Sequence, residues 1–194
     1  IGQKIQTPDV GILASVGKAQ VKVQKTPSIA IVSTGNELVE ITDNVLSHQI
    51  RRSNIFAVEA CLKSNGFQKI TLHHLKDEKE NIKSILPNIL EKHDVIILSG
   101  GVSMGKFDLI PSSLMECGIE EKFHNIKQKP GKPFWYGTNE RKFIYALPGN
   151  PVSTLLCLIR YVIPHLQRGA GMTVIQKFAY LEKELSFTQP ITFF

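Results

Sequence analysis

The stretch "DVIILSGGVSMGKFD", residues 94–108, decides the fold. Its first part is an uninterrupted apolar run, which is typical of a strand buried on both faces in the centre of a parallel sheet. The run ends in Ser99, Gly100 and Gly101, and a helical pattern begins near Leu109. Small residues between a strand and a helix indicate either a tight turn that needs glycine or a loop whose backbone N–H groups approach an anion. Both interpretations stay open at this point.

Strand-like and helix-like segments alternate before this stretch. Residues 28–33 form a short apolar run and residues 68–75 alternate in polarity, so both predict strands. Apolar spacing predicts one helix from Ser53, which would cap it, to about Asn65, and another from Asp77. The order predicts an α/β fold, a three-layer α/β/α sandwich with a mostly parallel sheet.

The second half of the chain adds a hairpin and a long helix. Residues 133–138 and 141–147 predict two antiparallel strands joined by a short polar turn. Asn150 predicts the N-cap of a helix that ends near Gly169 and bends at Pro164. The apolar face predicted for this helix comprises Val152, Leu155, Leu156, Ile159, Ile163 and Leu166.

Composition excludes several classes of protein. The formal net charge is +6, which suits an anionic partner, but the lysines are scattered, which does not favour nucleic-acid binding. The sequence holds no apolar run of about 18 residues, so no membrane span is predicted. The three cysteines have neither CxxC nor metal-ligand spacing, which fits a reducing cytoplasm. They are Cys61, Cys117 and Cys157.

Three carboxylates follow predicted strands: Glu37, Asp77 and Asp108. In parallel α/β folds the carboxyl ends of the strands form the ligand-binding edge. Carboxylates beside phosphate-binding loops at that edge suggest Mg²⁺, which commonly takes one or two of them together with phosphate oxygens. The alternatives are structural, because Glu37 could be a solvated acid, Asp77 could form a capping box with Glu80, and Asp108 could cap the next helix.

Further glycine-containing turns follow the other predicted strands. "STGNEL" (33–38) and "LPGNPVS" (147–153) have the same character as the turn after Ser99. "KPGKP" (129–133) sets Lys129 and Lys132 in a rigid turn. Two ammonium groups held in this way suit a phosphate or another oxyanion, and the structural alternative for "KPGKP" is a solvated basic turn. The structural alternative for "LPGNPVS" is a plain helix cap.

Five motifs in this order resemble one enzyme family. They are "STGNEL", "RRSN", "SGGVSMGKFD", "KPGKP" and "LPGNPVS". Together they closely resemble the molybdopterin molybdenumtransferases, a family that includes the E domain of gephyrin. The resemblance runs from about residue 28 to residue 171.

The resemblance implies a division of the chain. Residues 27–172 would be the molybdopterin-binding α/β domain, residues 1–26 the tail of the family's first domain, and residues 173–194 the start of its C-terminal β domain. Much of the first domain and most of the last domain would then be missing from this chain.

The resemblance also implies an activity. The family inserts molybdate into adenylylated molybdopterin with Mg²⁺ assistance and releases AMP, in the cytoplasm, at a cleft between the subunits of a homodimer. A molybdopterin adenylyltransferase is a possible partner. The catalytic residues implied are Glu37, Asp77, Asp108, Lys129 and Lys132, and the same three acids are the implied metal ligands. The implied ligand-binding residues are Thr34, Gly35, Asn54, Ser99, Gly100, Gly101, Ser103, Gly105, Pro130, Gly131, Pro148, Gly149, Asn150 and Ser153.

Two positions depart from the family pattern, which commonly has an acid where Asn36 and Arg52 stand. The leading alternative is a molybdopterin adenylyltransferase, which shares the fold and the glycine loop. A non-catalytic molybdopterin-binding or scaffold module is a third hypothesis. The lysine turn at residues 129–133 and the strand-like sequence after the last predicted helix favour the molybdenumtransferase.

Overall fold

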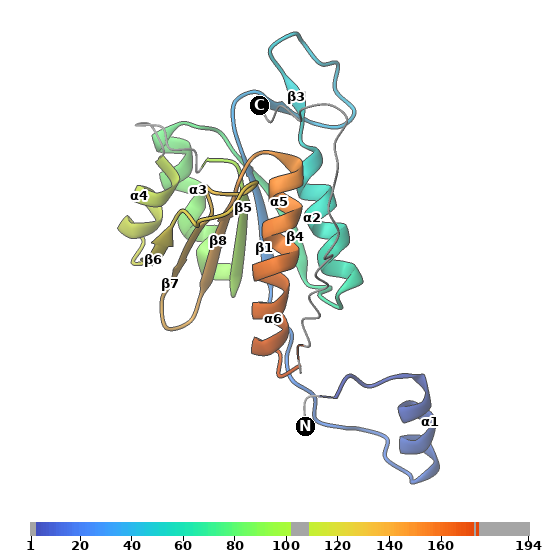
Figure 1. Cartoon of the computed structure of the whole chain (residues 1–194). Helices are drawn as coiled ribbons and strands as arrows, with labels where there is room; N and C mark the ends of the chain where they lie inside the picture. Colours follow the sequence, from blue (N-terminus) through green and yellow to red (C-terminus); the bar gives the residue numbers. More distant parts are fainter. Residues whose placement is uncertain (1–2, 102–108, 173, 175–194) are drawn as a thin grey trace, which may run out of the picture.

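A central six-stranded sheet organises the protein. The computed structural model describes residues 3–101, 109–172 and 174. Its sheet has the order β4-β1-β5-β8-β7-β6, in which the first four strands are parallel and the last two join antiparallel (Figure 1). The predicted three-layer α/β/α sandwich with a mostly parallel sheet is therefore confirmed. The strands are β1 (Ile29–Thr34), β4 (Ile70–Leu75), β5 (Val95–Ser99), β6 (Glu120–His124), β7 (Trp135–Thr138) and β8 (Phe143–Leu147).

The strand β5 is central, as its apolar run predicted. It pairs with β1 on one side and with β8 on the other, and every one of its residues is buried. The predicted hairpin between β7 and β8 also forms. Its turn is closed by Asn139, whose Oδ1 accepts hydrogen bonds from the backbone N–H groups of Arg141 and Lys142.

Helices cover both faces of the sheet. The residues of β1 alternate between two cores: Ile29 and Ile31 face one, and Ala30 and Val32 face the other. The first core includes residues of α2 (Ser53–Ser64), α5 (Pro151–Cys157) and α6 (Ile163–Gly169). The second includes residues of α3 (Lys79–Lys92) and α4 (Leu109–Glu116). Within the described ranges, no helix combines the length and the apolar character that a bilayer span needs.

Two predicted helix caps are wrong. Ser53 is the first residue of α2, so Arg52 stands at the N-cap position, and it makes no side-chain capping bond. Asp77 lies two residues before α3, whose N-cap residue is Glu78, so the predicted capping box with Glu80 does not form. The backbone N–H of Asp77 instead donates to Oδ1 of Asn36, 3.1 Å away, which holds the chain to the loop after β1.

The long helix differs from its prediction in the face that it buries. A π-helical segment (Leu158–Val162) separates α5 from α6, and Pro164 lies in the first turn of α6. Val152 and Ile159, both predicted in the core, are 67% and 58% exposed. Apolar residues surround this helix, so their spacing alone did not define the face, and the wider π turn shifts it further. The residues buried on α5 and the π segment are Ser153, Thr154, Cys157, Leu158 and Val162.

Two small elements lie outside the sandwich. A pair of short parallel strands, β2 (Leu38–Val39) and β3 (Ile50–Arg51), follows β1 at the carboxyl edge of the sheet. The helix α1 (Thr7–Ser15) has no buried residue and lies away from the sheet in Figure 1. Only the elements between β1 and α6 therefore position the site described below.

Replacing Gly137 by alanine should destabilise the protein. A β-carbon there would lie 2.8 Å from Cζ3 of Trp135 and 3.0 Å from the carbonyl oxygen of Glu120. Since Trp135 is fully buried and cannot move away, we expect an overpacking cost of about 1–3 kcal/mol in urea unfolding. Gly169→Ala is the matched control, because no described atom outside its chain neighbours and the backbone of its own helix lies within 4 Å of the added carbon. Equal stabilities of the two variants would contradict this account.

Candidate functional site

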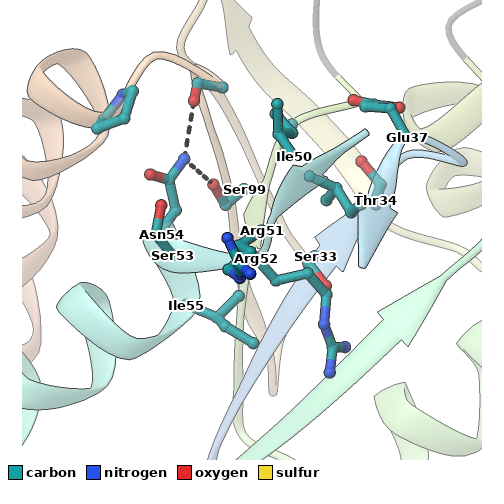
Figure 2. A pocket seen from close by; sticks show the side chains of 14 residues that line it. Ser33, Thr34, Glu37, Ile50, Arg51, Arg52, Ser53, Asn54, Ile55 and Ser99 are labelled. Carbon is teal, nitrogen blue, oxygen red and sulfur yellow. Dashed lines mark hydrogen bonds between the residues drawn. The ribbon is translucent and has the colours of Figure 1, made fainter. Parts of the chain in front are cut away.

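A cavity opens at the carboxyl edge of the sheet, where parallel α/β folds bind ligands. Its walls come from the ends of β1 and β5, from β2 and β3, and from the starts of α2 and α5 (Figure 2). In Figure 2, Thr34 and Glu37 lie on the β1 side, and Asn54 and Ser99 lie on the α2 side. The lining residues are Ser33, Thr34, Glu37, Leu38, Ile50, Arg51, Arg52, Ser53, Asn54, Ile55, Ser99, Gly100, Gly149 and Pro151.

The side-chain amide of Asn54 joins three walls of this cavity. Its Nδ2 donates to Oγ of Ser99 (3.0 Å), to the carbonyl oxygen of Gly149 (2.8 Å) and to Oγ1 of Thr154 (3.3 Å). These bonds tie α2 to the end of β5 and to the loop that leads into α5 (Figure 2). Asn54 therefore positions the glycine turns relative to one another, in addition to lining the cavity.

The glycines in the turn after β5 have a structural reason. Gly100 and Gly101 have φ angles of +91° and +68°, which other residues rarely adopt. A β-carbon at Gly101 would lie 2.7 Å from Oγ1 of Thr34 and 2.9 Å from Cγ1 of Ile110. The turn therefore needs glycine in order to pack on β1. At Gly149, by contrast, the nearest described atom to an added β-carbon is 3.9 Å away, so its surroundings are open.

The structure brings two of the three predicted acids together. Burial raises the pKa of Asp77, and the negative charge of Glu37 raises it further. A β-carbon at Gly35 would lie 2.6 Å from Oε2 of Glu37, so the glycine leaves room for this carboxylate to fold back over the turn. Asp108 lies outside the described residues, as do Ser103 and Gly105. Among the described residues, no three His, Cys, Asp or Glu side chains gather as a metal-binding group.

The lysine turn lies at the same edge of the sheet but does not line the cavity. It precedes β7, whose first residue, Trp135, pairs with the end of β8 at Ala146. The turn is anchored by Gln128, whose Nε2 donates to the carbonyl oxygen of Pro130 and whose Oε1 accepts from the hydroxyl of Tyr161. A β-carbon at Gly131 would lie 2.9 Å from Sγ of Cys157. Lys129 and Lys132 are exposed at this turn.

The polar residues at the start of α5 serve the helix itself. Oδ1 of Asn150 accepts from the backbone N–H groups of Val152 (3.1 Å) and Ser153 (3.2 Å), so the predicted N-cap is confirmed. Ser153 is 5% exposed and its hydroxyl also bonds to Asn150. The carbonyl oxygen of Pro148 accepts from Oγ1 of Thr154. The side chains of Asn150 and Ser153 thus take part in capping α5. Contact of these two residues with a ligand is a proposal and not an observation.

The sequence did not predict four polar residues that line the cavity: Ser33, Arg51, Ser53 and Arg52. All four lie within the quoted motifs "STGNEL" and "RRSN", although none of them was expected to bind a ligand. The signal that could have identified Arg51, Arg52 and Ser53 is their place at the start of a helix, where backbone N–H groups favour an anion.

Similarity to known proteins agrees with this geometry. A family profile described as "Probable molybdopterin binding domain" matches residues 30–168, which is most of the chain. The chain belongs to this family of molybdopterin-binding domains.

Two curated relatives of this molybdopterin-binding domain are longer proteins named molybdopterin molybdenumtransferase. The Synechocystis relative is 41% identical over 190 residues, which cover 97% of this chain and 48% of the relative. The Staphylococcus aureus relative (strain Mu50) is 31% identical over 170 residues, with 88% and 41% covered. The chain therefore spans about half the length of these two relatives.

Solved structures place the molybdopterin-binding domain among similar folds. The crystal structure of a molybdopterin biosynthesis MoeA protein from Pyrococcus horikosii matches with a TM-score of 0.74 at 30% identity, covering 88% of this chain and 42% of that one. The structure of molybdenum cofactor biosynthesis protein B matches with a TM-score of 0.52 at 17% identity, covering 77% and 99%. The second match shows a shared fold only.

Exchanging Asn54 for aspartate should loosen the cavity walls. A carboxylate cannot donate to the carbonyl oxygen of Gly149, and it would face that oxygen directly. We expect a loss of about 1–3 kcal/mol in the free energy of unfolding, measured in urea. Asn81→Asp is the control, because Asn81 uses its Oδ1 as an acceptor, a role that aspartate keeps. A similar small loss in both variants would refute the joining role of Asn54.

The raised pKa of Asp77 predicts a pH-dependent gain in stability for Asp77→Asn. An acid with a raised pKa in the folded state loses stability as pH rises from its unfolded value, about 3.9, through its folded value. The variant lacks this loss, so it should be more stable than wild type at pH 7 and no more stable at about pH 3. Urea unfolding across this range measures the difference.

Asp94→Asn should give the opposite sign. Hydrogen bonds from the backbone N–H and hydroxyl of Ser28 lower the pKa of Asp94. That carboxylate therefore stabilises the fold at neutral pH, and its contribution is lost as pH falls below about 4. If both substitutions shifted stability in the same direction at pH 7, the contrast drawn between the two carboxylates would be wrong.

Proposed function

We propose that the protein from which this chain comes inserts molybdate into adenylylated molybdopterin and releases AMP, as a molybdopterin molybdenumtransferase. The observation that carries the proposal is the glycine-walled cavity at the carboxyl edge of the sheet, in a molybdopterin-binding domain whose curated relatives carry that name. The ligand would lie across the turns that contain Gly35, Gly100 and Gly149.

The acids and the lysines at the carboxyl edge of the sheet would have different roles. Glu37 and Asp77 fit Mg²⁺, which takes one or two carboxylates, and Asp108 is a further proposed ligand. A bound Mg²⁺ would supply positive charge to the phosphate oxygens. Burial and the neighbouring Glu37 disfavour ionised Asp77, which is the electrostatic situation that a cation relieves. Lys129 and Lys132 would hold an oxyanion at the open side of the cavity.

The proposed function also implies an assembly, a partner and a cellular compartment. We propose a homodimer in which a second subunit completes the site, a molybdopterin adenylyltransferase as the supplier of the adenylylated substrate, and the cytoplasm as the compartment. The chain covers about half of its curated relatives, which leaves room for the segments that such a dimer would need.

Release of AMP on the addition of molybdate tests the reaction. The complete protein is mixed with adenylylated molybdopterin and Mg²⁺, and AMP is followed by chromatography with and without molybdate. Molybdate-dependent AMP supports the proposal. Consumption of ATP with molybdopterin would indicate an adenylyltransferase instead, and ligand binding without turnover would indicate a binding or scaffold module.

Lys132→Ala should weaken molybdate-dependent turnover about tenfold or more. A fixed ammonium group in a charge-assisted hydrogen bond contributes about 1.5–3 kcal/mol, and about 1.4 kcal/mol is a factor of ten. The deficit should persist at high salt, whereas the contribution of a solvated lysine is small and screened. The melting temperature should barely change, since Lys132 is exposed.

Lys69→Ala is the control for Lys132. Lys69 is an exposed lysine just before β4, at the opposite edge of the sheet. If Lys132→Ala and Lys69→Ala give the same molybdate-dependent turnover at low and high salt, the lysine turn has a structural role only.

A further inference from the structure

Two histidines beside the edge strand of the sheet point at a single hydroxyl group. Nε2 of His73, on β4, lies 2.9 Å from Oγ1 of Thr71, and Nε2 of His93, at the end of α3, lies 2.8 Å from the same atom. In the register of β4 with β1, Thr71 pairs with Ala30 and His73 with Val32, which both face the core under α3 and α4. The cluster therefore lies on the face of the sheet opposite to α2, and none of its three residues lines the cavity.

The hydrogen bonds of His93 determine which of its ring nitrogens carries the lone pair. Nδ1 of His93 lies 2.8 Å from the carbonyl oxygen of Ile89, and a carbonyl oxygen can only accept, so Nδ1 carries the hydrogen. In the neutral ring, Nε2 is then the acceptor and faces Thr71 with its lone pair. Metal-binding histidines are commonly held in this way, with one nitrogen donating to a backbone carbonyl and the other on the ion. The ring is only 8% exposed, so packing also holds its orientation.

His73 is the more accessible of the two histidines. Its side chain is half-buried and Thr71 is exposed, so the cluster opens to solvent. Burial lowers the pKa of His73, and the proximity of His93 and Lys92 lowers it further. The ring is therefore neutral at pH 7, which is the form that binds metal ions.

The spacing of the three atoms suits the coordination sphere of a metal ion. Nitrogen ligands lie about 2.0–2.1 Å from zinc, so neighbouring ligands of an octahedral ion with such bonds lie about 3 Å apart. The two nitrogen–oxygen distances in the cluster, 2.9 Å and 2.8 Å, are close to that separation. The two rings stand edge to face, with centroids 5.6 Å apart and planes at 75°, so they do not stack on each other.

We propose that His73 and His93 bind a divalent transition-metal ion of the zinc or nickel class, with the Thr71 hydroxyl as a third, weaker ligand. Imidazole nitrogens suit these ions, whereas Mg²⁺ and Ca²⁺ prefer oxygen ligands. Within the described part of the chain, no third His, Cys, Asp or Glu side chain joins the two histidines, so water would occupy the remaining positions. The ion would tie the edge strand β4 to the end of α3, away from the cavity and from the Mg²⁺ proposed there.

Calorimetric titration of the complete protein, free of any polyhistidine tag, with zinc chloride and separately with nickel chloride tests this site. His73→Gln and His93→Gln should each lose one bound ion per chain, or bind it about tenfold more weakly or worse. His48→Gln is the matched control, because His48 is exposed in the loop between β2 and β3, and it should bind as wild type does. Lys92→Gln removes a nearby positive charge, so it should bind the ion more tightly.

Stability measurements separate the bound ion from the hydrogen bonds of the cluster. Urea unfolding in EDTA shows whether each variant is folded, and if His93→Gln is not, the half-buried His73 still gives the result through His73→Gln. Zinc should raise the urea midpoint of wild type and of His48→Gln but not that of His73→Gln, because an ion that binds only the folded state stabilises it. A purely structural histidine pair would instead lower stability in EDTA and leave the response to zinc unchanged, which would overturn the proposal.

Three binding results would also overturn it. They are equal affinity for zinc and nickel in wild type and His73→Gln, an equal loss in His48→Gln and His73→Gln, and an affinity that falls in Asp77→Asn but not in His73→Gln. The last result would put the ion in the cavity. Release of AMP does not depend on any of these outcomes, so the proposed function and the histidine site can fail separately.

Discussion

The pairing of β5 with β1 on one side and β8 on the other buries every residue of that strand. Parallel pairing aligns the carboxyl ends of these strands, so the turns after Thr34, Ser99 and Leu147 open at one edge. Each face of the sheet is covered by helices, and a slip of one residue would exchange the two cores. The register of β5 therefore sets the position of the whole cavity.

The same residues stabilise the fold and shape the site. Gly101 packs its backbone on Thr34 and Ile110, yet the turn it forms is also the wall of the cavity. Asn54 binds three separate elements with one amide group, and the cavity exists between the elements that it joins. Stability and ligand binding are therefore coupled at these positions, which is why the open surroundings of Gly149 are more useful for probing a ligand than the crowded ones of Gly101.

Several polar groups at the carboxyl edge of the sheet lie in unfavourable electrostatic environments. Asp77 is harder to ionise than a free aspartate, because of burial and the nearby Glu37. Arg52 and Thr34 each bury a donor that no described residue satisfies. At the opposite edge, Asp94 is satisfied by Ser28 through two hydrogen bonds of 2.8 Å. Perturbed and unpaired groups of this kind are characteristic of ligand sites, where a bound partner completes them.

The sequence by itself determined five of the six strands of the sheet, the helices that cover it and the edge at which ligands meet it, because apolar runs and turn residues are local signals. It did not predict β6, whose residues are mostly exposed. The strand at Val95–Ser99 and the N-cap Asn150 were identified in this way. The predicted burial of Val152 and Ile159 failed, because apolar residues surround that helix and a π-helical segment changes its face. The hydrogen bonds of Asn54 to Ser99 and Gly149 and the pairing of Arg52 with Glu40 were decided only by the tertiary structure. These contacts join residues from separate strands and helices, and their side-chain geometry depends on how the layers pack, which no local pattern encodes.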